Sequence, residues 1–565
     1  MRMRHLSSLI LITAFGCGGH STADNPDVCS DSDGDGQTDC DGDCNDGDPS
    51  VLSGGTEICG DGRDNNCDGV IDDGCNGLGT WVSGTAGNDT NPGTQAQPVA
   101  TIAKGLANAA TIGGGQDVYV AGGHYPEKVV MVEGTDIHGG YACAAIPCSW
   151  AHDPVANDTA ILDTDHEGVV APSTITRATK LDGFRIVGFA ATTGTQGAAI
   201  SISGAPTIYN NRIFGGMITS GTTSAGIALL APTSGSAMLS NNDITLGTSM
   251  GSAFGISFTS TAFPVTGSAV AEVRDNLIHG GTASSTAGIS AGTSGTGTVI
   301  IDNDIVTGST TPGAVARGGA WGIRVGGTAT IDMNRINVPP ATPGTCGPID
   351  MCGGMDSSSA TATITNNVVY GPPTAQATAV RLREVEVAAG AVVLNSNYLN
   401  AGGFPASSGT NQTFSAAVVL EYTGCGACGV NAVMGKIRNN ILDGGKNMRR
   451  YGVFEANSTN NRTNRPQALE NNLFYLAPPV GAFDFLYHQW NGTVGLDLTT
   501  IVQVNAITTP PAAMNLTGDP LVNASGHLTT GSPCINKGTA TEAPATDLDG
   551  APRTNGPPDI GADEM

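Results

Sequence analysis

Two short acidic segments near the amino terminus have the residue types and spacing of cation-binding loops. Glycine at position 6 of each, Gly36 and Gly69, permits the sharp turn that such loops make. Oxygen ligands alternate around it, with position 7 offering its backbone carbonyl: Asp31, Asp33, Asp35, Gln37 and Asp39 in the first segment, and Asp64, Asn66, Asp68, Val70 and Asp72 in the second. Because all of these ligands are hard oxygens, the pattern favours Ca²⁺ over copper or zinc.

Neither segment completes a helix-loop-helix calcium site. The glutamate expected at position 12 is replaced by Gly42 and Cys75, and no helical periodicity flanks either loop. Four nearby carboxylates are available to supply the remaining oxygens: Asp41, Asp43, Asp46 and Asp48. A solvated acidic linker is the alternative interpretation, and the repetition of one scheme among six cysteines favours metal binding over it.

The charge of the chain is concentrated in this region. Residues 24–75 contain 16 acidic side chains and one basic side chain, Arg63, and so carry more than half of the net charge of −26. Such a cluster repels itself unless a cation neutralises it. A surface of this sign is a poor partner for nucleic acid, so we expect no nucleic-acid binding.

The same region resembles a known type of repeat. It is similar to the MopE-type metal-binding repeat of secreted bacterial proteins and to the calcium-wrapped thrombospondin type 3 repeat. The resemblance is carried, in order, by Asp39-Cys40-Asp41, Asp46-Gly47-Asp48-Pro49, Glu57-Ile58-Cys59 and Asn66-Cys67-Asp68-Gly69. It implies a disulfide-tied, cation-dependent module over residues 29–75. The family name is associated with copper, but no histidine lies between Asp24 and Cys75, so Ca²⁺ remains the predicted cofactor.

Fourteen cysteines occur, mostly in local groups, which is typical of proteins from an oxidising compartment. Zinc is the alternative, but histidine partners at ligand spacing are absent. The six cysteines of the acidic module allow many pairings, and their connectivity stays open. The candidate disulfide cysteines outside it are Cys143, Cys148, Cys346, Cys352, Cys425 and Cys428. Cys534 stands apart and is predicted to be a reduced thiol in the core.

The first residues are typical of an export signal. A basic start precedes an apolar run from Leu9 to Phe15, and this run is too short to span a membrane permanently. Ala14-Phe15-Gly16-Cys17 resembles a bacterial lipobox, which implies a signal peptide at 1–16, lipidation of Cys17 and a flexible tether over 17–28. An ordinary signal peptide cleaved elsewhere is the alternative. We therefore expect an exported protein on the outer membrane or cell surface, held to the membrane by a lipid anchor.

A repeated motif, apolar-x-x-Asn-x-apolar, organises the rest of the chain. Its spacing of about 30 residues indicates a solenoid. Asparagine tolerates the left-handed backbone region at a turn, and its amide can hydrogen-bond to the same amide one coil above and below. The predicted ladder consists of Asn211, Asn242, Asn276, Asn303, Asn334, Asn367, Asn397, Asn440 and Asn472. A β-sandwich with scattered asparagine-rich turns is the alternative, but nine aligned copies disfavour it.

The predicted fold is therefore all-β: a right-handed parallel β-helix with a short capping helix, preceded by the small disulfide- and calcium-stabilised module. Residues 79–160 resemble the opening segment of bacterial right-handed β-helix proteins, which is a domain of unknown function. Within it, Thr101 to Ala110 is predicted to be a helix that covers the first coil. Coils follow over 161–514, and residues 515–565 resemble the terminal cap of these pectate-lyase-like folds.

The sequence predicts no catalytic residues. Polygalacturonase signatures are absent, and fold alone does not establish activity. The best charged group is Arg381, Arg383, Glu384 and Glu386, which alternation places outside the coil as a salt-bridged surface. Insertions around 339–357 and 402–428 are typical of a binding face, but loop drift pinned by disulfides is the alternative and is slightly favoured. We therefore expect a surface scaffold for adhesion or glycan binding, with polysaccharide or a cell-surface glycan as partner. A polysaccharide lyase or glycoside hydrolase is the first alternative, and a transition-metal-binding surface protein is the second.

Overall fold

A computed structural model of the chain describes the acidic module in part and most of the β-helix. The described residues are 36–37, 42–45, 48–55, 65–67 and 79–565, except 113–115, 163–166, 189, 192–195, 219–222, 231–234, 259–270, 284, 292–297, 311–319, 326–327, 339–351, 358–361, 375, 384–391, 404–413, 422–431, 434, 457–463, 478–482, 492, 510 and 555. The predicted signal peptide, the tether and Cys17 lie outside them.

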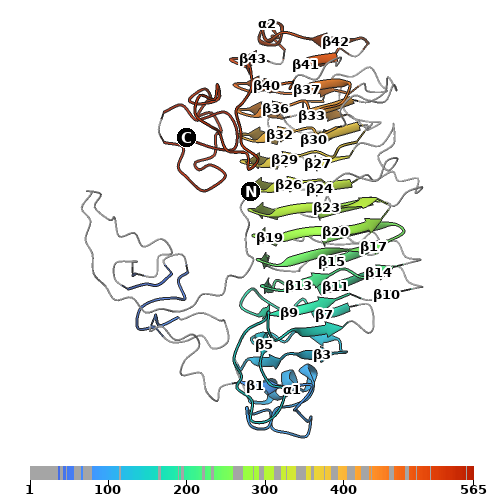
Figure 1. Cartoon of the computed structure of the whole chain (residues 1–565), viewed down its shortest axis with the longest axis vertical. Helices are drawn as coiled ribbons and strands as arrows, with labels where there is room; N and C mark the ends of the chain where they lie inside the picture. Colours follow the sequence, from blue (N-terminus) through green and yellow to red (C-terminus); the bar gives the residue numbers. More distant parts are fainter. Residues whose placement is uncertain are drawn as a thin grey trace.

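Three long sheets of parallel strands run through the described residues and wind as a right-handed β-helix (Figure 1). Each coil contributes one strand to each sheet, so that strands about 30 residues apart in sequence are hydrogen-bonded neighbours. This arrangement confirms the predicted fold class. The fold follows from a sequence in which every short apolar segment recurs at the same place in each period, because stacking places equivalent residues of successive coils next to each other.

The first sheet has 14 strands among the described residues. In spatial order they are β1 (Thr80–Val82), β2 (Val118–Ala121), β5 (Ile137–Tyr141), β8 (Lys180–Asp182), β12 (Thr207–Tyr209), β16 (Ala237–Ser240), β19 (Ala271–Arg274), β22 (Thr298–Ile301), β25 (Ala329–Asp332), β28 (Ala362–Thr365), β31 (Val392–Asn395), β35 (Lys436–Arg438), β39 (Ala468–Glu470) and β43 (Ala512–Ala513).

The second sheet lies across the asparagine turn from the first. Its strands are β3 (Gly123–Tyr125), β6 (Thr159–Leu162), β9 (Phe184–Val187), β13 (Arg212–Phe214), β17 (Asp243–Ser249), β20 (Leu277–Ala283), β23 (Asp304–Thr310), β26 (Arg335–Asn337), β29 (Val368–Tyr370), β32 (Tyr398–Asn400), β36 (Ile441–Asp443), β40 (Leu473–Tyr475) and β44 (Leu516–Thr517), with β10 (Ala190–Ala191) and β14 (Met217–Ile218) alongside.

The third sheet closes each coil and ends in an antiparallel pair, β41 with β42. Its strands are β4 (Val129–Val130), β7 (Glu167–Ala171), β11 (Gln196–Ile202), β15 (Thr223–Leu229), β18 (Ser252–Ser257), β21 (Ser285–Ala291), β24 (Ala320–Val325), β27 (Cys352–Ser357), β30 (Gln376–Arg383), β33 (Phe414–Glu421), β37 (Arg449–Glu455), β41 (Phe483–Trp490) and β42 (Gly495–Leu498). A separate pair is formed by β34 (Ala432–Val433) and β38 (Asn464–Arg465).

The turn between the first and second sheets differs in one detail from the expectation. The left-handed residue is not the repeated asparagine but the residue before it, as at Asp302, which precedes Asn303 and has φ of 51°. The reason is that the asparagine's own backbone N–H donates to the next coil, so the reversal of direction falls one residue earlier. Across the coils this position has φ between 51° and 57°, and it is occupied by Asn210, Asn241, Asp275, Asp302, Met333, Asn366, Ser396, Asn439, Asn471 and Met514.

The asparagine side chains form a continuous ladder inside the turn. Asn303 is typical: its Nδ2 donates to Oδ1 of Asn334 at 3.0 Å and to the carbonyl of Val273 at 2.9 Å. Its backbone N–H donates to the same Asn334 oxygen at 3.1 Å. Each amide is buried, so these bonds satisfy polar groups that water cannot reach. The same contacts recur at every predicted rung.

The ladder is longer than the nine predicted rungs. Asn515 accepts from Nδ2 of Asn472 at 3.0 Å and forms a tenth rung. The sequence motif missed it because Thr517, two residues later, is not apolar. At the other end, Phe184 occupies the asparagine position, and its backbone N–H donates to Oδ1 of Asn211 at 3.0 Å.

Aliphatic side chains from all three sheets fill the interior of the helix. The apolar residues that flank each asparagine in sequence, such as Ile300 and Ile305, are fully buried. The third sheet contributes a matching row that includes Ile323, Val380 and Val418. Burial of about one such side chain per sheet per coil, at roughly 1.5–3 kcal/mol each, is the main stabilising contribution.

Helices cover the first and last coils. Helix α1 (Ile102–Ile112) buries Ile102, Leu106 and Ala109 against the first coil, on the face predicted from the sequence. The carboxylate of Glu127 accepts from the first two backbone N–H groups of this helix, at 2.8 and 2.9 Å. At the far end, α2 (Ile501–Asn505) and β42 lie over the last coils (Figure 1). Such covers keep the open sheet edges from pairing with other chains.

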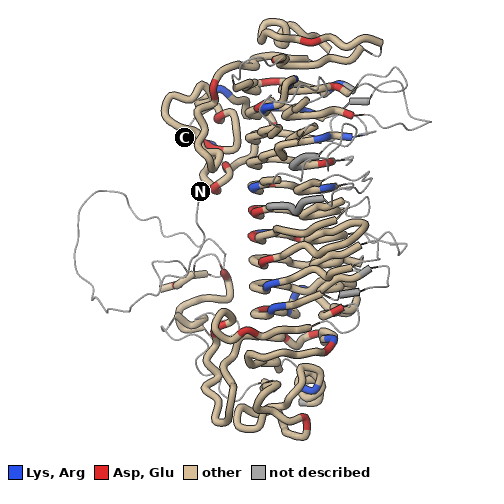
Figure 2. The backbone as a smooth tube through the Cα atoms, turned by 45° about the vertical axis from the view of Figure 1, so that its right-hand side comes forward, with Lys and Arg blue, Asp and Glu red and all other residues tan. Residues whose placement is uncertain are grey.

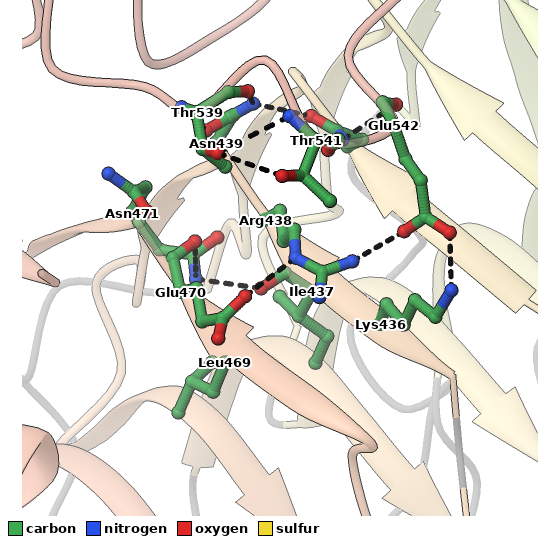
Figure 3. A network of polar contacts seen from close by, with 12 residues as sticks. Lys436, Ile437, Arg438, Asn439, Leu469, Glu470, Asn471, Thr539, Thr541 and Glu542 are labelled. Atoms are coloured by element: carbon green, nitrogen blue, oxygen red, sulfur yellow. Dashed lines mark hydrogen bonds and ion pairs between the residues drawn. The ribbon is translucent and has the colours of Figure 1, made fainter. Parts of the chain in front are cut away.

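The carboxyl-terminal segment lies along the side of the helix (Figure 1). Its apolar residues, including Leu528, Leu548 and Ile560, pack against Tyr398 and Ile441 of the second sheet. The side chains of the left-handed turn residues hold its backbone. Asn439 donates to the carbonyl of Thr539 (Figure 3), and Asn471 donates to the carbonyl of Lys537. Glu542 adds ion pairs with Lys436 and Arg438.

None of the described helices has the length and apolar character needed to cross a bilayer.

Replacing one rung should destabilise the protein strongly. Asn334→Ala leaves the backbone and side-chain N–H groups of Asn303 without an acceptor in a buried turn, so the free energy of unfolding should fall by about 3 kcal/mol. Urea unfolding followed by circular dichroism measures it. The matched control is Asn337→Ala on the same coil, because that asparagine is exposed and should change stability by less than about 0.5 kcal/mol. Equal effects of the two substitutions would refute the structural role of the ladder.

Candidate functional site

The described part of the acidic module is tied together by one disulfide and by backbone pairing. Cys44 and Cys67 are bonded, with their Cα atoms 5.7 Å apart. The backbone N–H of Leu52 donates to the carbonyl of Asn65 at 2.9 Å, which joins two described segments of the module. Asn65 is fully buried and donates through Nδ2 to the carbonyl of Ser50. The disulfide therefore holds residues 42–45 beside residues 65–67.

One carboxylate in this module has an unsatisfied oxygen. Asp43 is 6% exposed, and its Oδ1 accepts from the backbone N–H of Asn45 at 2.8 Å. Its Oδ2 is buried and has no hydrogen-bond partner among the described residues. A buried carboxylate oxygen without a donor is costly unless a cation or proton satisfies it. Asp43 therefore fits the role of a cation ligand.

The predicted ligands are only partly within the described residues. The side chain of Gln37 bonds Ser53 twice, accepting from its N–H at 2.9 Å and donating to its carbonyl at 3.1 Å. This leaves the Gln37 side chain structural, consistent with a role through its carbonyl alone. The carbonyl of Asn66 accepts from Gly54. The remaining predicted ligands lie outside the described residues: Asp31, Asp33, Asp35, Asp39, Asp64, Asp68, Val70 and Asp72.

The cysteines beyond the module are placed in part. Cys143 and Cys148 form a disulfide beside the aromatic cluster of the opening segment. Cys534 is a free thiol, and its burial raises its pKa to about 12, which suppresses the reactive thiolate. Three predicted disulfide cysteines lie outside the described residues, namely Cys346, Cys425 and Cys428, as does the side chain of Cys352.

A second candidate site lies on the outer face of the third sheet, centred on Asp356 of β27. Its side chain is fully buried and receives paired hydrogen bonds from Arg381 and Arg383 of β30, at 2.6 to 3.1 Å. Arg324 of β24 approaches within 3.5 Å. Burial raises the pKa of the Asp356 carboxyl, but the arginines outweigh burial and hold that pKa below its ordinary value. The site is therefore a fixed ion cluster in which arginines outnumber carboxylates.

Arg381 also lies over the ring of Trp321, with its guanidinium carbon 4.4 Å from the ring centroid. This contact and the Asp356 pairing explain why Arg381 is only 14% exposed. The sequence predicted the outward arginines but could not predict Asp356, Arg324 or Trp321 as their partners, because those residues belong to other coils. Glu384 and Glu386, which the sequence grouped with them, lie outside the described residues.

Aromatic side chains continue this outer face toward the last coils. Phe414 of β33, Tyr451 and Phe454 of β37, and Phe485 of β41 form one cluster with ring centroids 4.9 to 6.3 Å apart. Phe483, at the start of β41, is 55% exposed. The six strands from β24 to β41 span roughly 24 Å at the usual strand spacing. The outer face thus combines cationic and aromatic groups along the helix axis.

Along the coils of the asparagine ladder, the longest connections between strands flank this third sheet. Residues 338–351 precede β27, residues 401–413 precede β33, and residues 422–431 follow it. The turn between the first and second sheets, in contrast, stays at two residues along the ladder. Both predicted insertions therefore border the face that carries the arginines and aromatics. Figure 2 shows the charged residues of the coils gathered toward the edges of the stack.

Behind this face, Glu455 of β37 is a buried carboxyl. It accepts from the backbone N–H of Trp490 at 2.6 Å and from the hydroxyl of Tyr487. Burial raises the pKa of Glu455 to about 7, although these hydrogen bonds oppose the change. Its protonated form is therefore favoured in the folded protein relative to the unfolded chain.

Comparison with known proteins supports the metal-binding prediction. The MopE family model, described as a "putative metal-binding motif", matches residues 43–73. The match begins at Asp43 and contains the second predicted loop, while the first loop lies before it. The identity of the metal is not defined by this match. No curated protein sequence matches the chain.

Two solved structures are similar to this chain at low identity. Both are crystal structures of a lacto-N-biosidase of family GH136 from Eubacterium ramulus. The selenomethionine derivative is 11% identical, with 73% of this chain and 67% of that chain covered and a TM-score of 0.33. The native protein is 12% identical, with 78% and 67% covered and a TM-score of 0.24.

The stability of the protein should depend on pH through Glu455. A carboxyl with a raised pKa stabilises the fold below its unfolded pKa of 4.5, and the contribution is lost as pH rises through about 7. Glu455→Gln keeps the neutral form at every pH, so the difference in unfolding free energy between variant and wild type should grow by on the order of 3 kcal/mol from pH 4.5 to 8. Urea unfolding across this range measures it, and a difference that stays constant with pH would contradict the raised pKa.

Proposed function

We propose that this protein is an exported calcium-binding β-helix scaffold that binds acidic glycans at the cell surface. The observation that carries the metal part is the buried, unpartnered Oδ2 of Asp43 at the start of the matched motif. The surrounding sequence supplies carboxylate and carbonyl oxygens, which are the ligands that Ca²⁺ prefers. Asp43 would hold the ion together with the loop oxygens predicted from the sequence, and the ion would neutralise the acidic module.

The glycan part rests on the outer face of the third sheet. Three arginines surround Asp356 and Glu421 there, so the cluster carries a net positive charge and favours acidic sugars. The exposed ring of Phe483 and the neighbouring aromatic cluster offer flat apolar surfaces on which sugar rings can pack. Because the connections of variable length border this face, they are in position to set which glycan it accepts.

The proposal includes attachment to the outer membrane or cell surface through a lipid on Cys17. It rests on the basic start, the short apolar run and the Ala14-Phe15-Gly16-Cys17 ending. A flexible tether and the acidic module would then separate the β-helix from the membrane. Membrane fractionation of Cys17→Ala tests the anchor, since a variant that still sediments with membranes would rule it out.

Asp43→Asn should weaken calcium binding while leaving the module folded. The amide retains an oxygen acceptor for the N–H of Asn45 but removes the charge at Oδ2, so affinity at one Ca²⁺ site should fall by about 10-fold or more. Titration calorimetry with Ca²⁺, Cu²⁺ and Zn²⁺ measures the change. The matched control is Asp275→Asn in an exposed turn of the coils, which should bind Ca²⁺ like wild type. Tighter binding of copper than calcium at the Asp43 site would overturn the calcium assignment.

Phe483→Ala should weaken glycan binding without destabilising the fold, because this ring is 55% exposed. Loss of a stacking surface should lower affinity for an acidic polysaccharide by about 10-fold. Affinity electrophoresis against acidic and neutral polysaccharides measures it. Val155→Ala, at an 81% exposed site in the opening segment, is the control and should bind like wild type. Binding by Phe483→Ala that equals wild type would remove this face from the proposal.

The same polysaccharide panel separates a scaffold from an enzyme. If the purified protein depolymerises a polysaccharide and Arg381→Ala or Glu384→Ala loses this activity, the proposed scaffold function is wrong and the protein is a polysaccharide lyase or hydrolase. Intact polysaccharide after prolonged incubation, with binding retained, would support the scaffold.

A further inference from the structure

The opening coils carry a group of ionisable side chains that the proposed function does not use. It lies on the outer face of the first sheet, where β2, β5 and β8 are adjacent. The strand register pairs Tyr119 with His138 and His138 with Asp182. Asp117 and Asp136 precede β2 and β5, two residues before Tyr119 and His138, so they face the same side of the sheet. The cluster is thus assembled from three coils rather than from one sequence motif.

His138 is the centre of this group, and its two ring nitrogens have different surroundings. The side chain is 1% exposed, and Nδ1 lies 2.6 Å from Oδ1 of Asp182. The carboxylate accepts the Nδ1 proton, which leaves Nε2 with a lone pair in the neutral ring. Nε2 is buried, and no described residue lies within hydrogen-bonding distance of it as a partner. Metal-binding histidines have this arrangement: one ring nitrogen donates its proton to a carboxylate, and the other nitrogen keeps its lone pair for the metal.

Two carboxylates lie in front of this open nitrogen. Asp117 places Oδ2 at 3.9 Å from Nε2, while its Oδ1 accepts from the backbone N–H of Asp136 at 3.1 Å. Asp136 accepts through Oδ1 from the backbone N–H of Lys180 at 2.7 Å. These backbone bonds fix both carboxylates in place. One ligand atom from each of Asp117, Asp136 and His138 lies within 4.8 Å of the others.

This spacing is close to what a bound ion needs. Ligand atoms about 2 Å from one tetrahedral ion lie roughly 3.3 Å from each other. Closing the three ligand atoms around an ion therefore requires shifts of only about 1 Å, and the half-buried side chains of Asp117 and Asp136 can make them. Nitrogen and oxygen ligands together suit Zn²⁺ and similar transition ions better than Ca²⁺.

The local charge also favours a divalent cation. Three carboxylates meet here, Asp117, Asp136 and Asp182. Among the described residues, the one lysine that pairs with them is Lys180, with Nζ 4.0 Å from Asp136. With a neutral imidazole the described groups are left with two uncompensated negative charges, largely out of water. A divalent cation neutralises both. A protonated His138 neutralises only one, and its Nε2 proton would then have no acceptor within hydrogen-bonding distance.

We propose that His138, Asp117 and Asp136 form a transition-metal site in the opening coils, with Asp182 as the residue that positions the imidazole. The site is separate from the oxygen-ligand module around Asp43 and would accept Zn²⁺. A bound ion joins β2 to β5 directly, and to β8 through Asp182, so it strengthens the coils next to the α1 cover. The proposal does not depend on the glycan or calcium assignments.

Zinc stoichiometry of the full chain tests this. The protein is stripped with a chelator, saturated with Ca²⁺ to occupy the acidic module, dialysed against micromolar Zn²⁺ and analysed for bound metal. Wild type should bind one Zn²⁺ more than His138→Gln. Asp182→Asn should keep the site but weaken Zn²⁺ binding by about 10- to 100-fold. The matched control is His124→Gln, an exposed histidine on β3, which should bind Zn²⁺ like wild type.

Co²⁺ provides a readout that a merely structural role would not affect. Wild type loaded with Co²⁺ should show visible absorption bands of a site with nitrogen ligation, and these should be lost in His138→Gln. If circular dichroism shows that this variant does not fold, Asp117→Asn takes its place, since its side chain is 21% exposed. Equal Zn²⁺ content and equal Co²⁺ spectra in wild type and the folded variant would overturn the site and leave His138 as a buried imidazolium.

Discussion

The buried asparagine ladder is the interaction on which the rest of the structure depends. Each side-chain amide donates a hydrogen bond to the asparagine of the next coil and accepts one from the asparagine of the previous coil. Asn303, for example, donates to Asn334 and accepts from Asn276. The spacing of the ladder is therefore the spacing of the strands, and a coil cannot slip in register without breaking it. Because the amides are buried, a broken rung would leave several polar groups unsatisfied at once. One corner of the helix is thereby fixed for every coil.

This fixed corner allows the rest of each coil to vary. The chain can lengthen where it enters and leaves the third sheet, because the ladder and the apolar interior already set the register. The charged and aromatic groups around Asp356 and Tyr451 occur on that sheet's outer face, next to those variable connections. The ladder corner has a second use near the carboxyl terminus. There the left-handed residues Asn439 and Asn471 turn their side chains outward and hold the last segment along the flank.

The sequence predicted the repeating elements well because each of them is local. A motif such as the one around Asn303 carries its own turn and flanking strands, and nine copies align without reference to the fold. The helix before Ile112 was also predictable from its apolar spacing. The exact left-handed residue was not, because most coils have Asn or Asp at that position directly before the repeated asparagine, so two adjacent residues suit the left-handed region. Nor was the path of the last segment, which depends on contacts with coils far earlier in the chain, such as that of Asn395 with Glu542.

The two clusters of the β-helix show why sites on a solenoid are hard to predict from sequence. Asp356 and its arginines come from three successive coils, and each residue alone is an ordinary outward-facing side chain. His138 likewise acquires Asp117 and Asp182 only when β2, β5 and β8 stack. A cation loop such as Asp64–Asp72 differs, because consecutive residues supply its ligands and the spacing is visible in the sequence. Stacking at a constant rise thus converts positions one period apart into neighbours, and for this fold a search for sites has to compare residues at equal places in adjacent coils.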